Sequence, residues 1–135
     1  MDLSVTLGHL ELHNPIITAS GTFGYGVEYE PYGDLTHLGG IAVKGLSLEP
    51  RPGNPVPRLT ETPCGMLNAI GLQNIGAERF LSEMLPRLPW RETAVIANLY
   101  AQTEDEFARL AGLLSQEEGI AALEVNISCP NVKKG

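Results

Sequence analysis

Two short runs near the N-terminus, residues 4–7 and 9–13, alternate apolar with polar side chains on either side of Gly8. Alternation with a period of two is typical of a half-buried strand, and a glycine between two such runs is typical of a turn. The pattern therefore predicts an amphipathic β-hairpin over about residues 3–13 that covers another part of the fold.

Four later runs are almost continuously apolar. They cover residues 15–20, 40–44, 94–98 and 121–126. Continuous hydrophobicity over so few residues is typical of strands buried on both faces, as strands are in a parallel sheet. The chain is therefore expected to hold four parallel strands after the hairpin.

Helical patterns lie between the apolar runs, and the clearest covers residues 103–118. Thr103 and Glu106 form a T-x-x-E capping box, an apolar stripe at helical spacing follows, and Gly119 stands where a helix commonly ends. This segment is therefore predicted to be an amphipathic helix.

Two weaker helical patterns cover residues 76–85, ended by Pro86, and residues 31–38. Strands that alternate with helices indicate βα units and a parallel sheet, either open or closed into a barrel. An open dinucleotide-binding sheet carries G-x-G-x-x-G at its first strand-to-helix turn, and the glycines of SGTFGYGVEY, residues 20–29, do not fit that spacing. The sequence therefore favours an α/β fold of the (β/α)8 TIM-barrel type.

The composition fits a globular chain, since 43% of the 135 residues are apolar and 19% are charged. No run approaches the roughly 18 to 20 apolar residues that a membrane-spanning helix needs, and the first residues lack the layout of a signal peptide. We therefore expect a cytoplasmic protein without membrane contact.

The charge balance and the cysteine count exclude further classes. Nine Lys and Arg against sixteen Asp and Glu give a net charge of -7, so no basic patch for nucleic acid is expected. Cys64 and Cys129 are too few for a disulfide scaffold and lack the spacing of a zinc site. No metal is therefore expected.

Each of the four apolar runs ends on a polar side chain. These are Ser20, Lys44, Asn98 and Asn126. Because the carboxyl ends of barrel strands carry the active site, the four side chains are expected to form the floor of a ligand site. The alternative, open for Ser20 in particular, is that strands end in polar residues simply where they meet solvent.

Lys44 and Glu124 are charged residues within or at the end of apolar runs. An ammonium there is costly unless it meets an anion, so Lys44 is expected to bind a negative ligand or a developing negative charge. Glu124 lies two residues before Asn126, so both point the same way along a strand. A structural ion pair, with Lys44 as the candidate partner, is the favoured interpretation of Glu124.

The segment after the fourth run places a thiol between two amides. Pro130 disfavours helical geometry at Cys129, so the thiol is expected in an extended loop just past a strand end. Asn126 and Asn131 match the alternating N–H and C=O groups of an imide or pyrimidine ring. The pattern indicates a flat polar heterocycle beside a base or nucleophile. The alternative is that Cys129 is a small buried hydrophobic residue.

Five stretches together resemble the N-terminal part of the dihydroorotate dehydrogenase family, in particular the catalytic subunits of the soluble bacterial class that uses a cysteine base. They are ASGTFGYGVEY (19–29), VKGLSLEPRPGNPVPR (43–58), GMLNAIGLQN (65–74), VIANLY (95–100) and LEVNISCPNVKKG (123–135). The resemblance implies a (β/α)8 barrel that binds FMN at its carboxyl rim and oxidises (S)-dihydroorotate to orotate in pyrimidine biosynthesis.

The resemblance also implies roles for single residues. Cys129 corresponds to the base that removes the C5 proton while a hydride passes from C6 to FMN, and Lys44 to a lysine near flavin and substrate. The residues implied in substrate binding are Lys44, Asn68, Ile70, Gly71, Leu72, Asn126 and Asn131. Those implied in cofactor binding are Ala19, Ser20, Gly21, Lys44, Gly45, Asn98 and Asn126. Cys64 matches no motif position and is interpreted as a residue without a specific role.

The sequences of these motifs are most similar to those of the NAD-linked subtype, type 1B. This likeness implies an electron-transfer partner subunit that carries FAD and a 2Fe-2S cluster, in an assembly that is a heterotetramer or a homodimer. Dihydroorotate and orotate would be the small-molecule partners.

A complete barrel takes about 250 residues, so residues 1–135 are expected to be the first half of one FMN-binding domain, with about four βα units and the C-terminal half absent. Alone, such a half is expected neither to hold FMN tightly nor to turn over substrate. Two alternatives stay open. One is a flavin enzyme similar to dihydropyrimidine dehydrogenase, and the other is a non-catalytic truncated half barrel.

Overall fold

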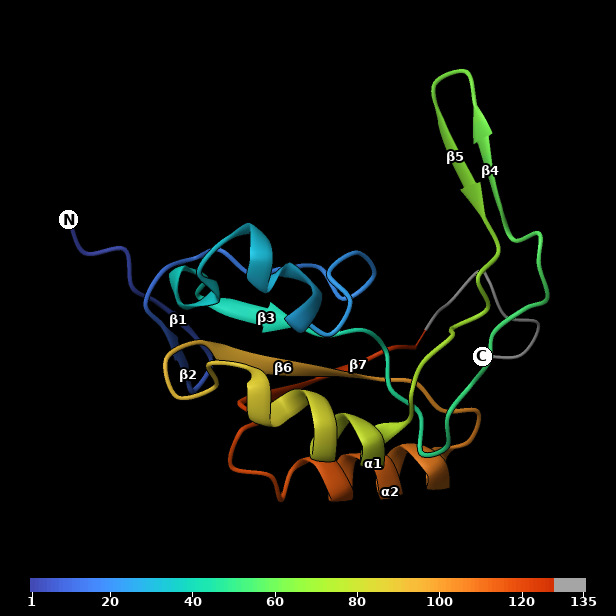
Figure 1. Ribbon diagram of the computed structural model, residues 1–135. Helices are drawn as coiled ribbons and strands as arrows, with labels where there is room; N and C mark the ends of the chain where they lie inside the picture. The colour runs from blue at the N-terminus through green and yellow to red at the C-terminus, as the bar shows by residue number, and fades with distance from the viewer. Residues whose placement is uncertain (128–135) are drawn as a thin grey trace.

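A parallel sheet is the centre of the fold. The computed structural model describes residues 1–127 of the chain. In it β3 (Gly40–Ala42), β6 (Ala94–Leu99) and β7 (Ala122–Val125) form a three-stranded parallel sheet in the order β3-β6-β7 (Figure 1). Three of the four expected strands are therefore present, and they run parallel as predicted.

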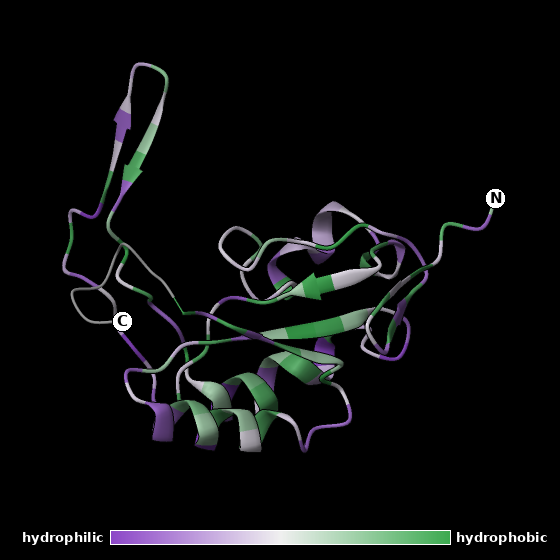
Figure 2. Ribbon diagram, turned by 180° about the vertical axis from the view of Figure 1, so that it is seen from behind, coloured by the Kyte–Doolittle hydropathy of each residue, from purple (hydrophilic) through white to green (hydrophobic). Residues whose placement is uncertain are grey.

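Helices cover one face of this sheet (Figure 1). One is α2 (Glu104–Leu114), and the other begins as α1 (Ala77–Arg79), continues through the π-helical η3 (Phe80–Met84) and ends in the 3-10 turn η4 (Leu85–Arg87). Figure 2 shows hydrophobic residues along the strands and on the helices packed against them. The core that they share includes Ile41, Val43, Val95, Ala97, Leu99, Phe80, Leu85, Leu110 and Leu114.

The opposite face of the sheet carries the polar side chains. Ala97 pairs with Leu123 across β6 and β7, and both pack into the core. Side chains alternate along a strand, so the next pair in the register, Asn98 and Glu124, points away from the helices. By the same alternation Lys44, just past β3, lies on this second face.

The first of the four expected strands, residues 15–20, is reduced to a single bridge. Ile17 bridges Gly40 in parallel fashion, and Thr18 N donates a hydrogen bond to Gly40 O at 3.1 Å. Beyond that point Ala42 N donates to Thr18 Oγ1 at 3.0 Å. A side-chain oxygen therefore takes the place of the next backbone acceptor, and the ladder stops.

Thr103 caps α2 as predicted, but the helix ends earlier than expected. Thr103 Oγ1 accepts a hydrogen bond from Glu106 N at 3.2 Å. The last helical residue is Leu114, about one turn before the predicted end, because the chain then continues in tighter turns. Gly119 is a site of close packing and not a helix end, since a Cβ there would lie 3.2 Å from the side chain of Leu85.

The other two helical predictions are correct in place and differ in type. Residues 76–85 are largely helical, and Pro86 lies inside the final 3-10 turn and does not end the helix. Residues 31–38 hold parts of two 3-10 helices, η1 (Val27–Tyr32) and η2 (Leu35–His37). Between them lie Gly33, which has an extended backbone, and Asp34, which caps η2. In the described part of the chain, no helix is long and apolar enough to cross a membrane.

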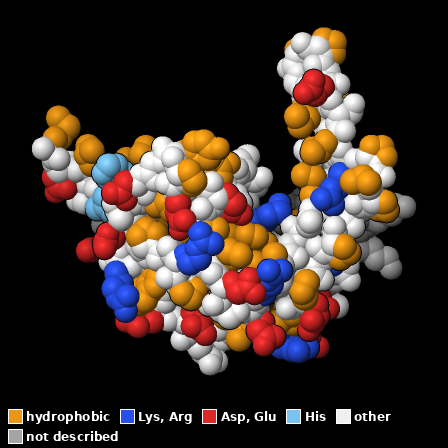
Figure 3. Space-filling view, viewed as in Figure 1, with side chains coloured by type: hydrophobic (Ala, Val, Ile, Leu, Met, Phe, Trp, Pro, Cys, Tyr) orange, Lys and Arg blue, Asp and Glu red, His pale blue; other side chains and the backbone are white. Residues whose placement is uncertain are grey.

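Two antiparallel hairpins flank the sheet. β1 (Val5–Leu7) and β2 (Leu10–Leu12) form the N-terminal hairpin, as predicted. β4 (Leu59–Thr62) and β5 (Gly65–Asn68) form a second hairpin that stands away from the body (Figure 1) and that no pattern described above predicts. Figure 3 shows apolar side chains along it. The side chains more than half exposed there include Leu59, Met66 and Leu67.

Cys64 lies in the turn of the second hairpin. Thr62 pairs with Gly65, so Pro63 and Cys64 are the two residues that reverse the chain between β4 and β5. The Cys64 thiol is free and exposed at this turn. The interpretation of Cys64 as a residue without a specific role stays a prediction.

Candidate functional site

The polar ends of the three strands meet at one cavity. Lys44 follows β3, Asn98 lies near the end of β6 and Asn126 follows β7. Because parallel neighbours end at the same edge of a sheet, these side chains come together there, around a cavity of about 270 Å³. Six further predicted site residues line the same cavity. They are Ser20, Gly21, Gly45, Asn68, Ile70 and Leu72.

Four predicted site residues are not among those that line the cavity. The Ala19 carbonyl accepts a hydrogen bond from Thr22 N at 3.0 Å and so closes the turn that carries its two neighbours. Gly71 is buried between two lining residues. Cys129 and Asn131, the expected base and one expected amide, lie outside the described residues.

Lys44 is the one charged side chain among the described residues that line the cavity. Among residues 1–127 it makes no ion pair, so its predicted pairing with Glu124 is wrong. The strand order gives the reason. β6 lies between β3 and β7, and neighbouring strands are about 4.8 Å apart, so Glu124 meets a residue of β6 before it reaches Lys44.

Glu124 instead binds two residues of the predicted site. Its Oε1 accepts a hydrogen bond from Ser20 Oγ at 2.7 Å and another from Asn98 Nδ2. Sequence reasoning placed Glu124 on the correct side of its strand but assigned the wrong partner. The partner of Glu124 depends on which strand lies next to β7, and no pattern in the sequence indicates the order of the strands.

The backbone approaches the cavity closely near its polar groups. A Cβ on Gly45 would lie 2.8 Å from Asn98 Oδ1, so a side chain at this position would displace the amide. Gly71 and Leu72 both have left-handed backbones, with φ values of 77° and 55°, which is uncommon for leucine. Asn74 Nδ2 donates to Leu72 O at 3.1 Å and supports this conformation. Strained backbone held in this way is common at ligand sites.

The arrangement suits a flat polar ring. The carboxamides of Asn68, Asn98 and Asn126 provide hydrogen-bond donors and acceptors, and Lys44 provides a positive charge. The glycines allow a ring to come close to the backbone. In the part of the chain that the structure describes, no group of His, Cys, Asp and Glu is arranged to hold a metal ion. The described lining residues offer hydrogen-bonding groups together with one cation.

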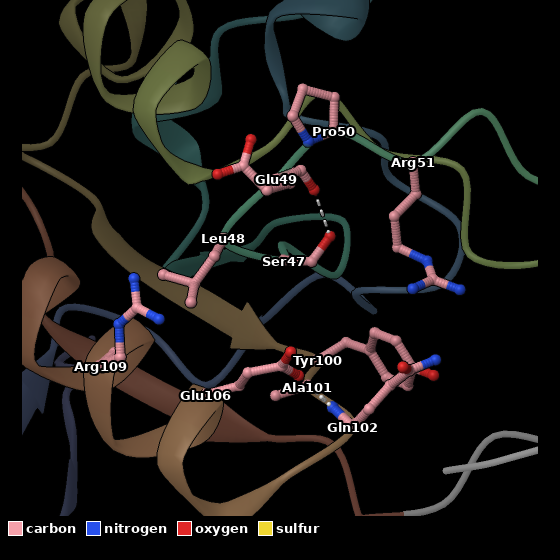
Figure 4. Close-up of a pocket in the computed structure, with 10 residues that line it drawn as sticks. All are labelled: Ser47, Leu48, Glu49, Pro50, Arg51, Tyr100, Ala101, Gln102, Glu106 and Arg109. Carbon is pink, nitrogen blue, oxygen red and sulfur yellow. Dashed lines mark hydrogen bonds between the residues drawn. The ribbon is translucent and has the colours of Figure 1, made fainter.

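A second cavity, also of about 270 Å³, lies between the loop after β3 and the first turn of α2 (Figure 4). It is lined by Ser47, Leu48, Glu49, Pro50, Arg51, Tyr100, Ala101, Gln102, Glu106 and Arg109. The Arg51 guanidinium lies 5.1 Å from the centroid of the Tyr100 ring, and Glu106 accepts a hydrogen bond from Gln102 N at 2.8 Å. None of the predicted site residues lines it, so the first cavity is the candidate site.

Comparisons with known proteins agree on one family. A family model described as dihydroorotate dehydrogenase matches residues 2–135. Two relatives named dihydroorotate dehydrogenase B (NAD(+)), catalytic subunit, come from Solidesulfovibrio magneticus and Maridesulfovibrio salexigens. They are 72% and 64% identical over 135 residues. Each match covers 100% of this chain and 44% of the relative, so the chain spans less than half the length of these relatives.

The fold is shared with a solved structure, that of DHODH from Eimeria tenella in complex with ferulenol. The TM-score is 0.66 at 22% sequence identity, and the match covers 98% of this chain and 38% of that chain. This likeness confirms the predicted α/β fold, that of the N-terminal part of a barrel.

Proposed function

The chain belongs to the dihydroorotate dehydrogenase family, and we propose that the complete protein oxidises (S)-dihydroorotate to orotate in pyrimidine biosynthesis at the cavity where β3, β6 and β7 end. One observation carries the proposal. All nine residues that line the cavity are residues to which the family resemblance assigns flavin or substrate contacts, although they range from position 20 to position 126 of the chain.

The described residues fit a flavin, and the cofactor proposed is FMN. Ser20, Gly21, Gly45 and Asn98 would hold the ring, with Lys44 beside it. The close approach of Gly45 to Asn98 Oδ1 leaves no room for a side chain, which suits a flat ring against the backbone. When bound, the flavin supplies the acceptor for the hydride that leaves C6 of the substrate.

The protein's own groups handle the proton and the developing charge. Cys129 is proposed as the base that removes the proton from C5, so that a C5=C6 double bond forms and orotate results. Loss of a proton next to a carbonyl builds negative charge on the ring. The Lys44 ammonium and the carboxamides of Asn68 and Asn126 would stabilise this charge.

A partner subunit is proposed to complete the electron transfer. The Solidesulfovibrio and Maridesulfovibrio relatives are named as NAD(+)-dependent catalytic subunits, a name that implies another subunit in those proteins. By this likeness the partner of the present protein carries FAD and a 2Fe-2S cluster and passes electrons to NAD. With this partner the assembly would be a heterotetramer, and the catalytic subunits alone would form a homodimer.

Reduction of bound flavin by the substrate tests the proposed activity. The complete protein, loaded with FMN and kept free of oxygen, is mixed with dihydroorotate or with dihydrouracil while the absorbance of oxidised flavin is followed. Dihydroorotate is expected to bleach the flavin and dihydrouracil is not, because only dihydroorotate carries a carboxylate for the Lys44 side of the cavity. Bleaching by dihydrouracil alone would instead assign the protein to dihydropyrimidine oxidation.

A further inference from the structure

Glu124, Asn98 and Ser20 form one closed group of hydrogen bonds at the cavity edge. Glu124 Oε1 accepts from Ser20 Oγ at 2.7 Å and from Asn98 Nδ2, and Asn98 Nδ2 lies 3.4 Å from Ser20 Oγ. Glu124 and Asn98 are also direct neighbours in the register of β6 and β7. The backbone therefore holds the carboxylate and the carboxamide side by side.

A carboxylate fixes the orientation of the carboxamide that it contacts. An ionised carboxylate only accepts hydrogen bonds, so the NH₂ group of Asn98 must face Glu124 and its Oδ1 must face away. The Ser20 hydroxyl both donates and accepts, so it alone would not choose between the two orientations. With Glu124 present, Oδ1 points toward Gly45, where a Cβ would lie 2.8 Å from it.

We propose that Glu124 is a positioning residue that orients the Asn98 carboxamide, so that the cavity offers an acceptor, Oδ1, to an N–H group of a bound imide-type ring. The inference rests on the proposed function, because that function supplies the ring. Asn98 and Gly45 line the cavity and Glu124 does not, so the carboxylate acts through Asn98 and not on the ligand itself.

Two rings of the proposed reaction carry an N–H group between carbonyls, namely the flavin and the dihydropyrimidine. The resemblance assigns Asn98 to the flavin, so the flavin N–H is the expected partner. A flavin methylated at this nitrogen lacks the donor and cannot use the oriented acceptor. Binding of methylated and unmethylated flavin therefore separates orientation of Asn98 from a general structural role of Glu124.

The test titrates the complete apoprotein with FMN and with N3-methyl-FMN, with the quenching of flavin fluorescence as the binding signal. The variants are Glu124→Ala, Glu124→Gln, Asn98→Ala and the double variant Asn98→Ala/Glu124→Ala. Glu118→Gln is the matched control, since Glu118 is an exposed carboxylate in the loop before β7 and its change removes the same charge. Circular dichroism of each variant reports whether the protein is folded.

The expected result is a loss that is selective for the unmethylated ring. Glu124→Ala should weaken FMN binding about tenfold, the factor that corresponds to one hydrogen bond of about 1.4 kcal/mol, and leave N3-methyl-FMN binding within about twofold. Glu124→Gln keeps a hydrogen-bonding partner for Asn98 without fixing its orientation, so its loss should be smaller. The double variant should bind FMN no more weakly than Asn98→Ala, because contacts that act through one another are not additive.

Two results would overturn the inference and leave the proposed function standing. One is an equal loss for both flavins in Glu124→Ala, and the other is multiplication of the two single losses in the double variant. Glu124→Ala could instead spare both flavins and weaken the binding of orotate, but not of N3-methylorotate, to the flavin-loaded protein. In that case the N–H group belongs to the pyrimidine, and the orienting role of Glu124 is supported. Absence of flavin binding by the unchanged protein would overturn the proposed function and this inference with it.

Discussion

Replacing Cys129 with alanine in the complete enzyme is expected to lower kcat for dihydroorotate by about 10²- to 10⁴-fold, the usual contribution of a positioned general base. Flavin binding should be unchanged, because the flavin contacts proposed here come from other residues. Steady-state rates with dihydroorotate and the absorbance of bound flavin measure the two effects separately. A loss in kcat with flavin retained is the signature of a missing proton acceptor.

The control for this prediction is the other cysteine. Cys64 is exposed in the turn between β4 and β5, away from the cavity, so Cys64→Ala should leave kcat unchanged. The same comparison excludes a general effect of thiol removal on the protein. If Cys129→Ala turns over dihydroorotate at the normal rate near neutral pH, Cys129 has no part in the mechanism.

Replacing Lys44 with alanine is expected to lower kcat/KM by about 10²- to 10³-fold, comparable to the loss of one preorganised group that stabilises charge in a transition state. Lys44 is the one charged lining residue among those described, so no neighbour in that set replaces its charge. The loss should appear in flavin affinity as well as in turnover. Lys44→Arg keeps the charge and should recover part of the flavin affinity.

Arg109→Ala is the matched control for the loss of a cation. Arg109 lies on α2 and lines the second cavity (Figure 4), so its removal should change neither flavin affinity nor kcat/KM. Normal affinity of Lys44→Ala for both flavin and dihydroorotate would show that Lys44 serves only the fold. A larger effect of Arg109→Ala than of Lys44→Ala would move the site to the second cavity.

Local patterns predicted much of the fold because each has a local physical cause. Continuous apolar runs mark β3, β6 and β7, since strands of a parallel sheet are buried on both faces. The Thr103 cap sets the start of α2 through a contact three residues away. The polar residues at the strand ends come together at one cavity because parallel strands end at the same edge.

The features that were missed depend on contacts between distant segments. The expected strand at residues 15–20 stops because the Thr18 side chain binds Ala42 N, and nothing within that run signals this contact. The partner of Glu124 depends on β6 lying between β3 and β7, which is a matter of strand order. The hairpin of β4 and β5 is mostly exposed. It therefore lacks the buried face that gives a strand its regular pattern of apolar residues.

A crystal structure of the complete protein with orotate bound would show directly whether this cavity is the substrate site. We expect orotate in the cavity at the ends of β3, β6 and β7, in contact with Lys44, Asn68 and Asn126, with the sulfur of Cys129 facing its C5 atom. Orotate in the cavity of Arg51, Tyr100 and Arg109 would overturn the proposed function, as would a Cys129 sulfur packed away from the ring.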